Sequence, residues 1–94
     1  MYGTVMIGKT HATNEQLLAL TREWAEAKGN GVGYVDQWVL RTDDGQVVVA
    51  VRFASKQAYD KLADDPDQDT WYQEKLRPML DDDPTWFDGE WSKP

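Results

Sequence analysis

The chain has 94 residues, the length of one small domain, and we predict a single domain over residues 1–94. It contains no cysteine, which excludes disulfides and thiolate metal sites. Its net charge of −7 argues against nucleic acid or an anionic membrane as a partner, because both are bound through Lys and Arg. So short a chain has a small core, and association with a second copy is the simplest source of extra stability.

The negative charge is concentrated late in the chain. Residues 60–90 hold 11 acidic and three basic side chains, so this segment carries −8 and the remainder +1. We expect the acidic segment to lie outward around the entrance to any pocket, where it disfavours anionic ligands.

The ends and apolar stretches show no targeting pattern. The N-terminus lacks the charged and apolar regions of a secretion signal. The longest apolar stretches, 2–8 and 47–51, fall far short of the roughly 20 residues that a spanning helix needs. We therefore expect a cytoplasmic protein.

The first third of the chain predicts a strand followed by a helix. Residues 2–9 are rich in β-formers and predict the strand. Thr13 and Gln16 have the spacing of a capping box, which predicts that a helix starts there and continues to Lys28-Gly29. The glycine-rich residues 29–33 follow a helix and precede a strand, which is the wrong context for a phosphate-binding loop, so we predict a simple connection.

Residues 34–42 and 46–54 predict two strands of a hairpin. We place Asp44-Gly45 in a two-residue type I′ turn, which sets Trp38 opposite Val51. One face of the hairpin is then strongly apolar, with Trp38, Leu40, Val47, Val49, Val51 and Phe53. The other face is mixed, with Gln37, Val39, Arg41, Val48, Ala50 and Arg52. This mixed face is too apolar to be simply solvated, so we expect both faces to be covered.

The last part predicts two short helices and a strand. Ser55 is placed to cap the first helix, and Asp65 to cap the second, with Pro66 at its first position. Pro78 removes a backbone donor and should kink or restart the second helix. The second helix buries Tyr72, Leu76, Met79 and Leu80, and residues 85–91 predict a final edge strand.

The resulting order βαββαβ predicts an α+β, ferredoxin-like fold with a four-stranded antiparallel sheet and helices on one face. The helices leave the other sheet face without a cover. We predict a homodimer through this outer sheet face, since a second copy is the simplest cover.

Three segments carry a resemblance to a known family. They are the opening strand Tyr2-Gly3-Thr4-Val5-Met6, the segment DPDQDTWY at 65–72, and the closing DPTWFDGE at 83–90. With the strand order, they make the chain resemble small members of the antibiotic biosynthesis monooxygenase family, which are dimeric α/β-barrel proteins. The resemblance implies a cofactor-independent monooxygenase-like protein that acts on or binds a small aromatic or polycyclic molecule in a pocket between sheet and helices.

The resemblance also implies particular site residues. Oxygenases of this family use an Asn-x-x-x-Trp pattern, and the matching spacing here is Asp67-x-x-x-Trp71, with a carboxylate in place of the amide. Members that degrade haem use an Asn on the first strand and a His on the second helix. This chain has Met6 and Ile7 on its first strand and no histidine after His11. We therefore expect neither haem degradation nor any cofactor.

The candidate catalytic residues are Asp67, Trp71 and His11. Asp67 or His11 would remove a proton from an electron-rich, anthrone-like substrate, whose carbanion then reacts with oxygen. Trp71 and a tyrosine would hold the ring system, although Trp71 could instead pack at the edge of the core. His11, the only histidine, could equally be a solvated loop residue.

The candidate substrate-binding residues are aromatic. Trp38 and Phe53 would form the floor of a cleft, and three tyrosines would present hydroxyls to the ligand: Tyr34, Tyr59 and Tyr72. Ordinary core packing is the alternative role for all five.

No metal site is expected. The run Asp65-Pro66-Asp67-Gln68-Asp69 imitates the start of a calcium loop, but Thr70 and Leu76 stand where that loop needs Gly and Glu. Two functions stay open: a monooxygenase-like enzyme with an aromatic pocket between sheet and helices, and a non-catalytic small-molecule-binding or dimerisation module. The first predicts a closed apolar cavity that touches Trp71, Trp38 and Phe53, and the second a filled interior.

Overall fold

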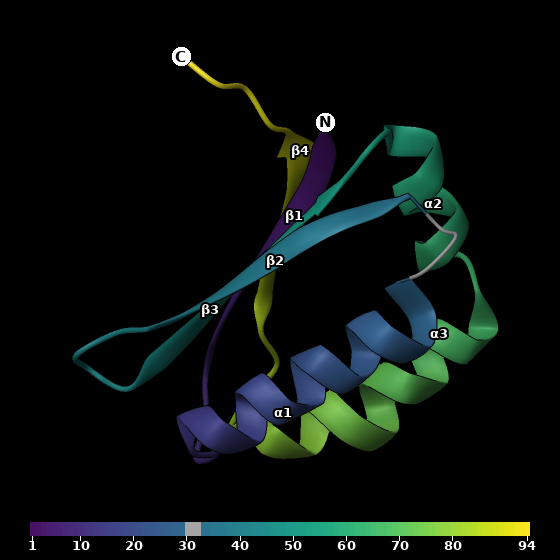
Figure 1. Ribbon diagram of the computed structural model, residues 1–94. Helices are drawn as coiled ribbons and strands as arrows, with labels where there is room; N and C mark the ends of the chain where they lie inside the picture. Colours follow the sequence, from purple (N-terminus) through teal and green to yellow (C-terminus); the bar gives the residue numbers. More distant parts are fainter. Residues whose placement is uncertain (30–32) are drawn as a thin grey trace.

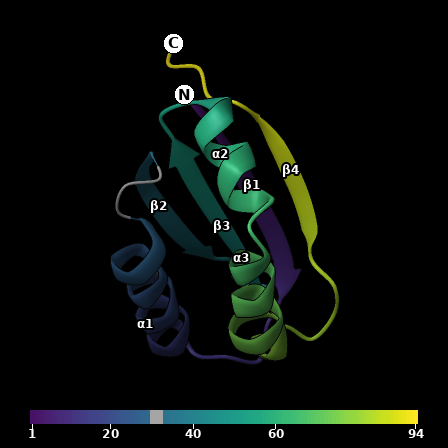
Figure 2. The ribbon, with the colours of Figure 1, turned by 90° about the vertical axis from the view of Figure 1, so that its right-hand side faces the viewer.

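The computed structural model describes residues 1–29 and 33–94. Its four strands form one antiparallel sheet in the order β2-β3-β1-β4 (Figure 1). The described helices all cover the same face of this sheet (Figure 2). The predicted ferredoxin-like arrangement is confirmed. The strands are β1 (Tyr2–Lys9), β2 (Tyr34–Arg41), β3 (Gln46–Phe53) and β4 (Thr85–Glu90).

Two helical rods and one short helix make the covering layer. The first rod is α1 (Asn14–Trp24), which widens into a π-helical turn, η1 (Ala25–Gly29). The short helix is α2 (Lys56–Ala63). The second rod is α3 (Pro66–Trp71), continued by the π-helical η2 (Tyr72–Leu76) and the 3-10 turn η3 (Arg77–Met79). The predicted glycine-rich connection falls partly on residues 30–32, outside the described residues.

The helices begin where their capping residues predict. Thr13 Oγ1 accepts a bond from the Gln16 amide at 3.2 Å, and the Gln16 side chain accepts one from the Thr13 amide at 2.9 Å, which completes the capping box. Ser55 and Asp65 cap α2 and α3 in the same manner. Pro78 lies in η3, where the regular helix has already given way to a tighter turn.

The predicted register of the β2–β3 hairpin is wrong by one residue. Thr42 pairs with Gln46 through a backbone bond of 3.0 Å, so the loop between them has three residues and Gly45 takes its positive φ of 88°. Because side chains alternate along a strand, this shift turns over the part of β2 from Asp36 to Arg41, while an irregularity between Tyr34 and Asp36 keeps Tyr34 on the inner face. Trp38 lies opposite Ala50 and Leu40 opposite Val48, on the outer face, where the two side chains are 71% and 60% exposed.

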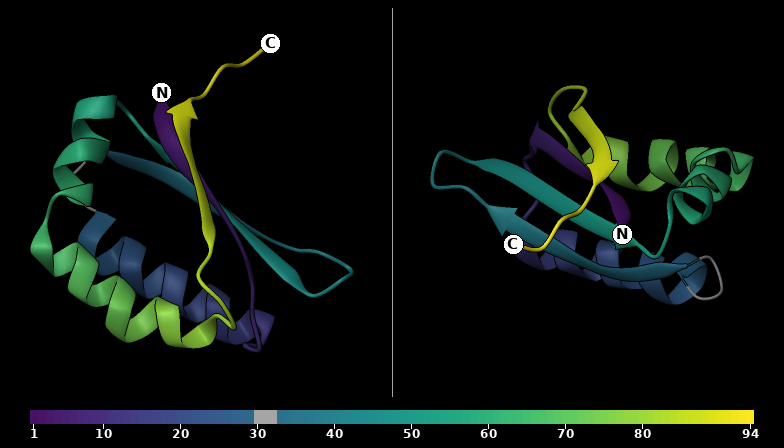
Figure 3. Two further views of the ribbon diagram at one scale, coloured as in Figure 1. Left: turned by 180° about the vertical axis from the view of Figure 1, so that it is seen from behind. Right: turned by 90° about the horizontal axis from the view of Figure 1, so that it is seen from above.

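The core lies between the inner sheet face and the helices. It is formed by apolar side chains from β1, β3 and the helices, chiefly Met6, Leu17, Leu20, Val47, Val49, Phe53, Leu62, Leu76 and Leu80. On the outer face, the indole of Trp91 lies over Gly3 and donates to the Val51 carbonyl at 3.4 Å. The chain ends run close together at one end of the sheet (Figure 3). Within the described residues, no helix has the length and apolar character needed to cross a membrane.

Candidate functional site

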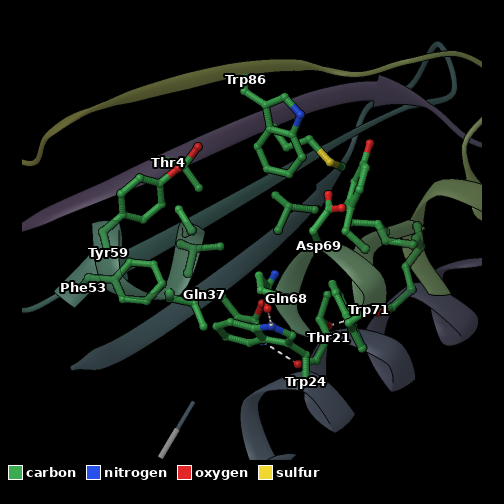
Figure 4. Close-up of a pocket in the computed structure, with 18 residues that line it drawn as sticks. Thr4, Thr21, Trp24, Gln37, Phe53, Tyr59, Gln68, Asp69, Trp71 and Trp86 are labelled. Atoms are coloured by element: carbon green, nitrogen blue, oxygen red, sulfur yellow. Dashed lines mark hydrogen bonds between the residues drawn. The ribbon is translucent and has the colours of Figure 1, made fainter. Parts of the chain in front are cut away.

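A cavity of about 250 Å³ lies between the inner sheet face and the helices (Figure 4). This volume is just below the range of about 300–1,000 Å³ that is common for ligand pockets. The wall is largely apolar and aromatic, and it draws on β1, β2, β3, β4 and all three α-helices: Thr4, Met6, Leu17, Thr21, Trp24, Gln37, Val49, Val51, Phe53, Tyr59, Leu62, Ala63, Gln68, Asp69, Trp71, Tyr72, Leu76 and Trp86. Asp69 is the single ionisable carboxylate among these residues.

A row of aromatic rings builds one side of the cavity. The ring centroids of Trp24 and Trp71 are 6.3 Å apart, and those of Trp24 and Tyr34 are 5.3 Å apart. Phe53 continues the row, at 6.3 Å from Tyr34 and 5.4 Å from Tyr59. The rings meet tilted or edge-on, the geometry that the aromatic quadrupole favours, so the wall holds its shape without a ligand.

A second aromatic pair closes the side near β4. Tyr72 and Trp86 meet edge to face with centroids 5.7 Å apart. Trp86 comes from the edge strand and keeps 46% of its surface exposed, so this pair forms the rim of the cavity rather than its floor.

The tyrosine hydroxyls at the site stay protonated at neutral pH. Burial, followed by a hydrogen bond of 2.9 Å to the Asp88 carboxylate, raises the pKa of Tyr59 to about 12. Burial likewise raises the pKa of Tyr72 and of Tyr34 above the ordinary value. Because the Tyr59 proton is donated to Asp88, this hydroxyl can only accept a hydrogen bond from a ligand. None of the three hydroxyls is suited to act as a base at neutral pH.

The structure leaves Asp67 and His11 outside the cavity wall. Asp67 is exposed on the first turn of α3, where its backbone amide donates to the Asp65 cap. His11 is exposed in the loop after β1, with Nδ1 at 2.9 Å from a carboxylate oxygen of Asp81. The carboxylate that does line the cavity is Asp69, two residues beyond Asp67.

The helical period places three residues of this segment on one face of the helix. Gln68, Trp71 and Tyr72 stand at i, i+3 and i+4, so they share the face of α3 that meets the sheet. Asp69 flanks this face on the side of Tyr72 and reaches the wall, whereas Asp67 lies on the other flank. Of this face, Trp71 was predicted as a site residue and Gln68 was not, although the same spacing marks both.

Four of the predicted substrate-binding and catalytic residues do line the cavity, namely Phe53, Tyr59, Trp71 and Tyr72. Tyr34 does not line it and packs behind the wall against Trp24 and Phe53. The predicted position of Trp38 on the cavity floor is wrong, because the hairpin register turns it to the outer face.

Several wall residues were not predicted. Gln37 was missed because the predicted register put it on the opposite face. Trp24 stands in the helical stripe of Leu17, Leu20 and Thr21, which indicated core packing but no cavity. Trp86 comes from a strand whose inward face depends on its pairing with β1.

One polar atom in the wall is unusual. Thr4 is 6% exposed, and its Oγ1 is buried without a hydrogen-bond partner among residues 1–29 and 33–94. It lies beside the Tyr59 hydroxyl (Figure 4). This contact lowers the pKa of Tyr59 against the larger effect of burial, but it is too long or too poorly oriented to count as a hydrogen bond that satisfies Thr4. The orphaned hydroxyl costs stability, since a buried polar group without a partner loses its bonds to water.

Potential metal ligands do not converge in the described part of the chain: no group of three or more His, Asp or Glu side chains is placed to hold an ion.

Comparison with known proteins gives the same fold. No protein-family profile and no curated protein sequence matches the chain. Among solved structures, a mutant of SnoaB, a cofactor-independent oxygenase from Streptomyces nogalater, superposes with a TM-score of 0.72 at 16% identity, covering 99% of this chain and 96% of that one. Rv0793 from Mycobacterium tuberculosis has a TM-score of 0.71 at 15% identity, with coverage of 99% and 96%.

A monooxygenase from the gene ActVA-Orf6 of Streptomyces coelicolor, in complex with the ligand Nanaomycin D, has a TM-score of 0.70 at 16% identity and covers 99% of this chain and 88% of that one. Other structures with this fold are described as antibiotic biosynthesis monooxygenases. The resemblance seen in the sequence is thus confirmed at the level of the fold.

Proposed function

We propose that the chain is a cofactor-independent monooxygenase-like protein, which binds a small aromatic molecule in the cavity and oxidises it with molecular oxygen. The observation that carries the proposal is the cavity itself, whose wall is aromatic and apolar and holds a single carboxylate. The fold shared with SnoaB and the ActVA-Orf6 monooxygenase supports the same reaction class.

The chemistry rests on the substrate's own electrons. A base takes one proton from an acidic CH₂ group that lies between aromatic rings, and the carbanion passes electrons to oxygen as a carbon–oxygen bond forms. Loss of water then leaves a carbonyl. In total, one CH₂ group and one O₂ give one C=O group and one water, so no outside reductant is required.

The wall residues divide these tasks. Asp69 is the base, because it is the one carboxylate that lines the cavity, and the tyrosine hydroxyls are held protonated. Trp71 and Phe53 sandwich the ring system through their faces and edges. Tyr72 and Trp86 form the rim through which the ligand enters.

Oxygen uptake with anthrone tests the proposal. The parent protein should consume one O₂ per anthrone, above the rate in buffer, and yield anthraquinone. Asp69→Asn should slow this at least about 100-fold, because a positioned base contributes roughly 10²–10⁴-fold. Asp67→Asn makes the same change two residues away and should leave the rate unchanged. Uptake no faster than in buffer, or equal rates for Asp69→Asn and the parent, would contradict the proposal.

We further propose that the outer sheet face pairs with a second copy. The face exposes large apolar side chains, with Trp38 at 71%, Leu40 at 60% and Phe87 at 56%, beside Val48 and Ala50. Such a contiguous patch is costly in water. Because the acidic segment lies mainly on the helices and on loops, the sheet face can meet its own copy without strong repulsion.

Sedimentation tests the dimer. The parent should sediment at twice the chain mass of 10.8 kDa at micromolar concentration. Trp38→Glu, which puts a charge at the most exposed side chain of the patch, should give monomers. A parent protein that sediments as the monomer would refute the pairing.

A further inference from the structure

Two glutamine side chains flank Trp24 at the end of the cavity nearest α1 (Figure 4). Gln37, from β2, donates through Nε2 to the Thr21 carbonyl at 2.7 Å. Gln68, from α3, accepts through Oε1 a bond of 2.9 Å from the Trp24 indole N–H. Both glutamines line the cavity.

These partners fix how each amide is turned. A carbonyl oxygen only accepts and an indole N–H only donates, so neither amide can exchange its nitrogen and oxygen without losing its bond. Gln37 must therefore keep its nitrogen toward α1, and Gln68 must keep its oxygen toward Trp24. Preorganised polar groups of this kind bind a ligand with little loss of side-chain entropy.

Each amide then has one polar atom left over. No hydrogen bond in the described part of the chain uses Gln37 Oε1 or Gln68 Nε2. Neither atom is among the fully buried unpaired ones, so both remain accessible. The Gln37 side chain also lowers the pKa of Tyr34, against the larger effect of burial, through a hydrogen bond to its hydroxyl. A bond that lowers the pKa of a phenol is one donated to it, so it comes from Gln37 Nε2 and leaves Oε1 unused.

We propose that Gln37 Oε1 and Gln68 Nε2 are a paired acceptor and donor that select the ligand, and that the ligand is a neutral fused-ring aromatic carrying both a hydroxyl and a carbonyl group. The hydroxyl donates to Gln37 and the carbonyl accepts from Gln68. The inference rests on the cavity of the proposed function and adds the substrate class. The Asp69 carboxylate on the same wall excludes ligands that carry a carboxylate.

Four related probes test this selection without any turnover. They are 2-hydroxyfluoren-9-one with both groups, fluoren-9-one with the carbonyl only, 2-hydroxyfluorene with the hydroxyl only, and fluorene with neither. Binding is followed by quenching of tryptophan fluorescence, since Trp24, Trp71 and Trp86 line the cavity. The parent should bind 2-hydroxyfluorenone tightest, and loss of either group should cost about three- to tenfold in Kd.

Gln68→Glu is the decisive variant. A carboxylate keeps an oxygen for the Trp24 N–H and replaces the ligand-facing donor by an acceptor. It should therefore invert the preference, so that 2-hydroxyfluorene binds better than fluorenone. Gln37→Leu, with a side chain of similar size, should abolish only the preference for the hydroxyl. Tyr34→Phe is the matched control and should change neither preference. Thermal melts establish that each variant is folded.

The outcomes separate this inference from the proposed function. Equal binding of all four probes by the parent overturns the inference, as does fluorene binding where 2-hydroxyfluorenone does not bind. A Gln68→Glu protein that keeps the parent's preference for the carbonyl also overturns it. If the predicted preferences are found but anthrone causes no oxygen uptake, the selection stands and the oxidation does not.

Discussion

Two buried threonines, Thr4 in β1 and Thr10 just after it, allow the substitution Thr→Val to be tested at two sites. We expect it to raise the free energy of unfolding at Thr4 and to lower it at Thr10. Thr4 Oγ1 is buried without a partner within the described residues. Thr10 is as buried, at 7% exposure, but its Oγ1 donates to the Met79 carbonyl at 2.6 Å and accepts from the Ala12 amide at 3.0 Å. Valine has nearly the shape of threonine, so Thr→Val removes little besides the hydroxyl.

The magnitudes follow from the hydrogen bonds. A buried unsatisfied polar group costs about 1–3 kcal/mol, so Thr4→Val should raise the free energy of unfolding by about 1 kcal/mol. For a domain of this size, that corresponds to a rise in Tm of about 4–8 °C. Thr10→Val leaves the Met79 carbonyl and the Ala12 amide without their partner, and it should lower the free energy of unfolding by about 2 kcal/mol.

Urea unfolding followed by tryptophan fluorescence measures both variants under one set of conditions. The difference between Thr4→Val and Thr10→Val is the decisive quantity, because effects common to the substitution cancel in it. If Thr4→Val is destabilising by as much as Thr10→Val, then the Thr4 hydroxyl has a partner in the folded protein, and the description of this part of the cavity wall is wrong.

Three further predictions concern pH and packing. The pKa of Tyr59 is about 12 in the folded protein against 10.0 in the unfolded chain, so the unfolded chain ionises first. The contribution of Tyr59 to stability is therefore fully present below pH 10 and is lost as pH rises through 12, a fall of about 1 kcal/mol after solvent screening. Urea titrations at pH 9 and pH 11 should show a smaller fall for Tyr59→Phe than for the parent. The hydrogen bond from Arg52 lowers the pKa of Asp36 below its ordinary value of 3.8. The Asp36 carboxylate therefore stabilises the fold above pH 3.8, and this stabilisation is lost as pH falls through the lowered pKa of the folded protein. In acid unfolding, Asp36→Asn should lack this loss of stability. Gly3→Ala would make a methyl group clash with the Val51 carbonyl oxygen and the Trp91 indole, so it should lower the free energy of unfolding by at least about 2 kcal/mol, as followed by thermal melts. Gly89→Ala has open space around the added atom and should cost far less.

Local signals in the sequence predicted the elements well. Capping residues such as Thr13 and Ser55 act on the amides of their own helix, so their role is visible from spacing alone. The ferredoxin-like arrangement followed from the order of the elements, since few arrangements satisfy short connections and right-handed crossovers.

The hairpin register could not be predicted in the same way. Asp43-Asp44-Gly45 supports a two-residue or a three-residue loop, and the choice between them decides which face of β2 is buried. The predicted two-residue loop placed Trp38 in the cavity and Gln37 outside it, whereas the three-residue loop of the structure does the reverse.

The polar members of the site depend on tertiary contacts. Gln68 and Asp69 reach the cavity because α3 lies along the inner sheet face, and nothing in their local sequence distinguishes Asp69 from Asp67 as a wall residue. Four aromatic members, by contrast, were predicted, because large rings at helical and strand spacing must be buried somewhere: Phe53, Tyr59, Trp71 and Tyr72.

Isotope labelling tests the central claim, that the cavity oxidises an aromatic ligand with molecular oxygen, most directly. Anthrone is incubated with the protein under ¹⁸O₂, and the anthraquinone is analysed by mass spectrometry. The account predicts product formed faster than in buffer, one heavy oxygen atom in its new carbonyl, and loss of this enhancement in Asp69→Asn. Product formed only at the buffer rate, or an enhancement that survives in Asp69→Asn, would contradict it.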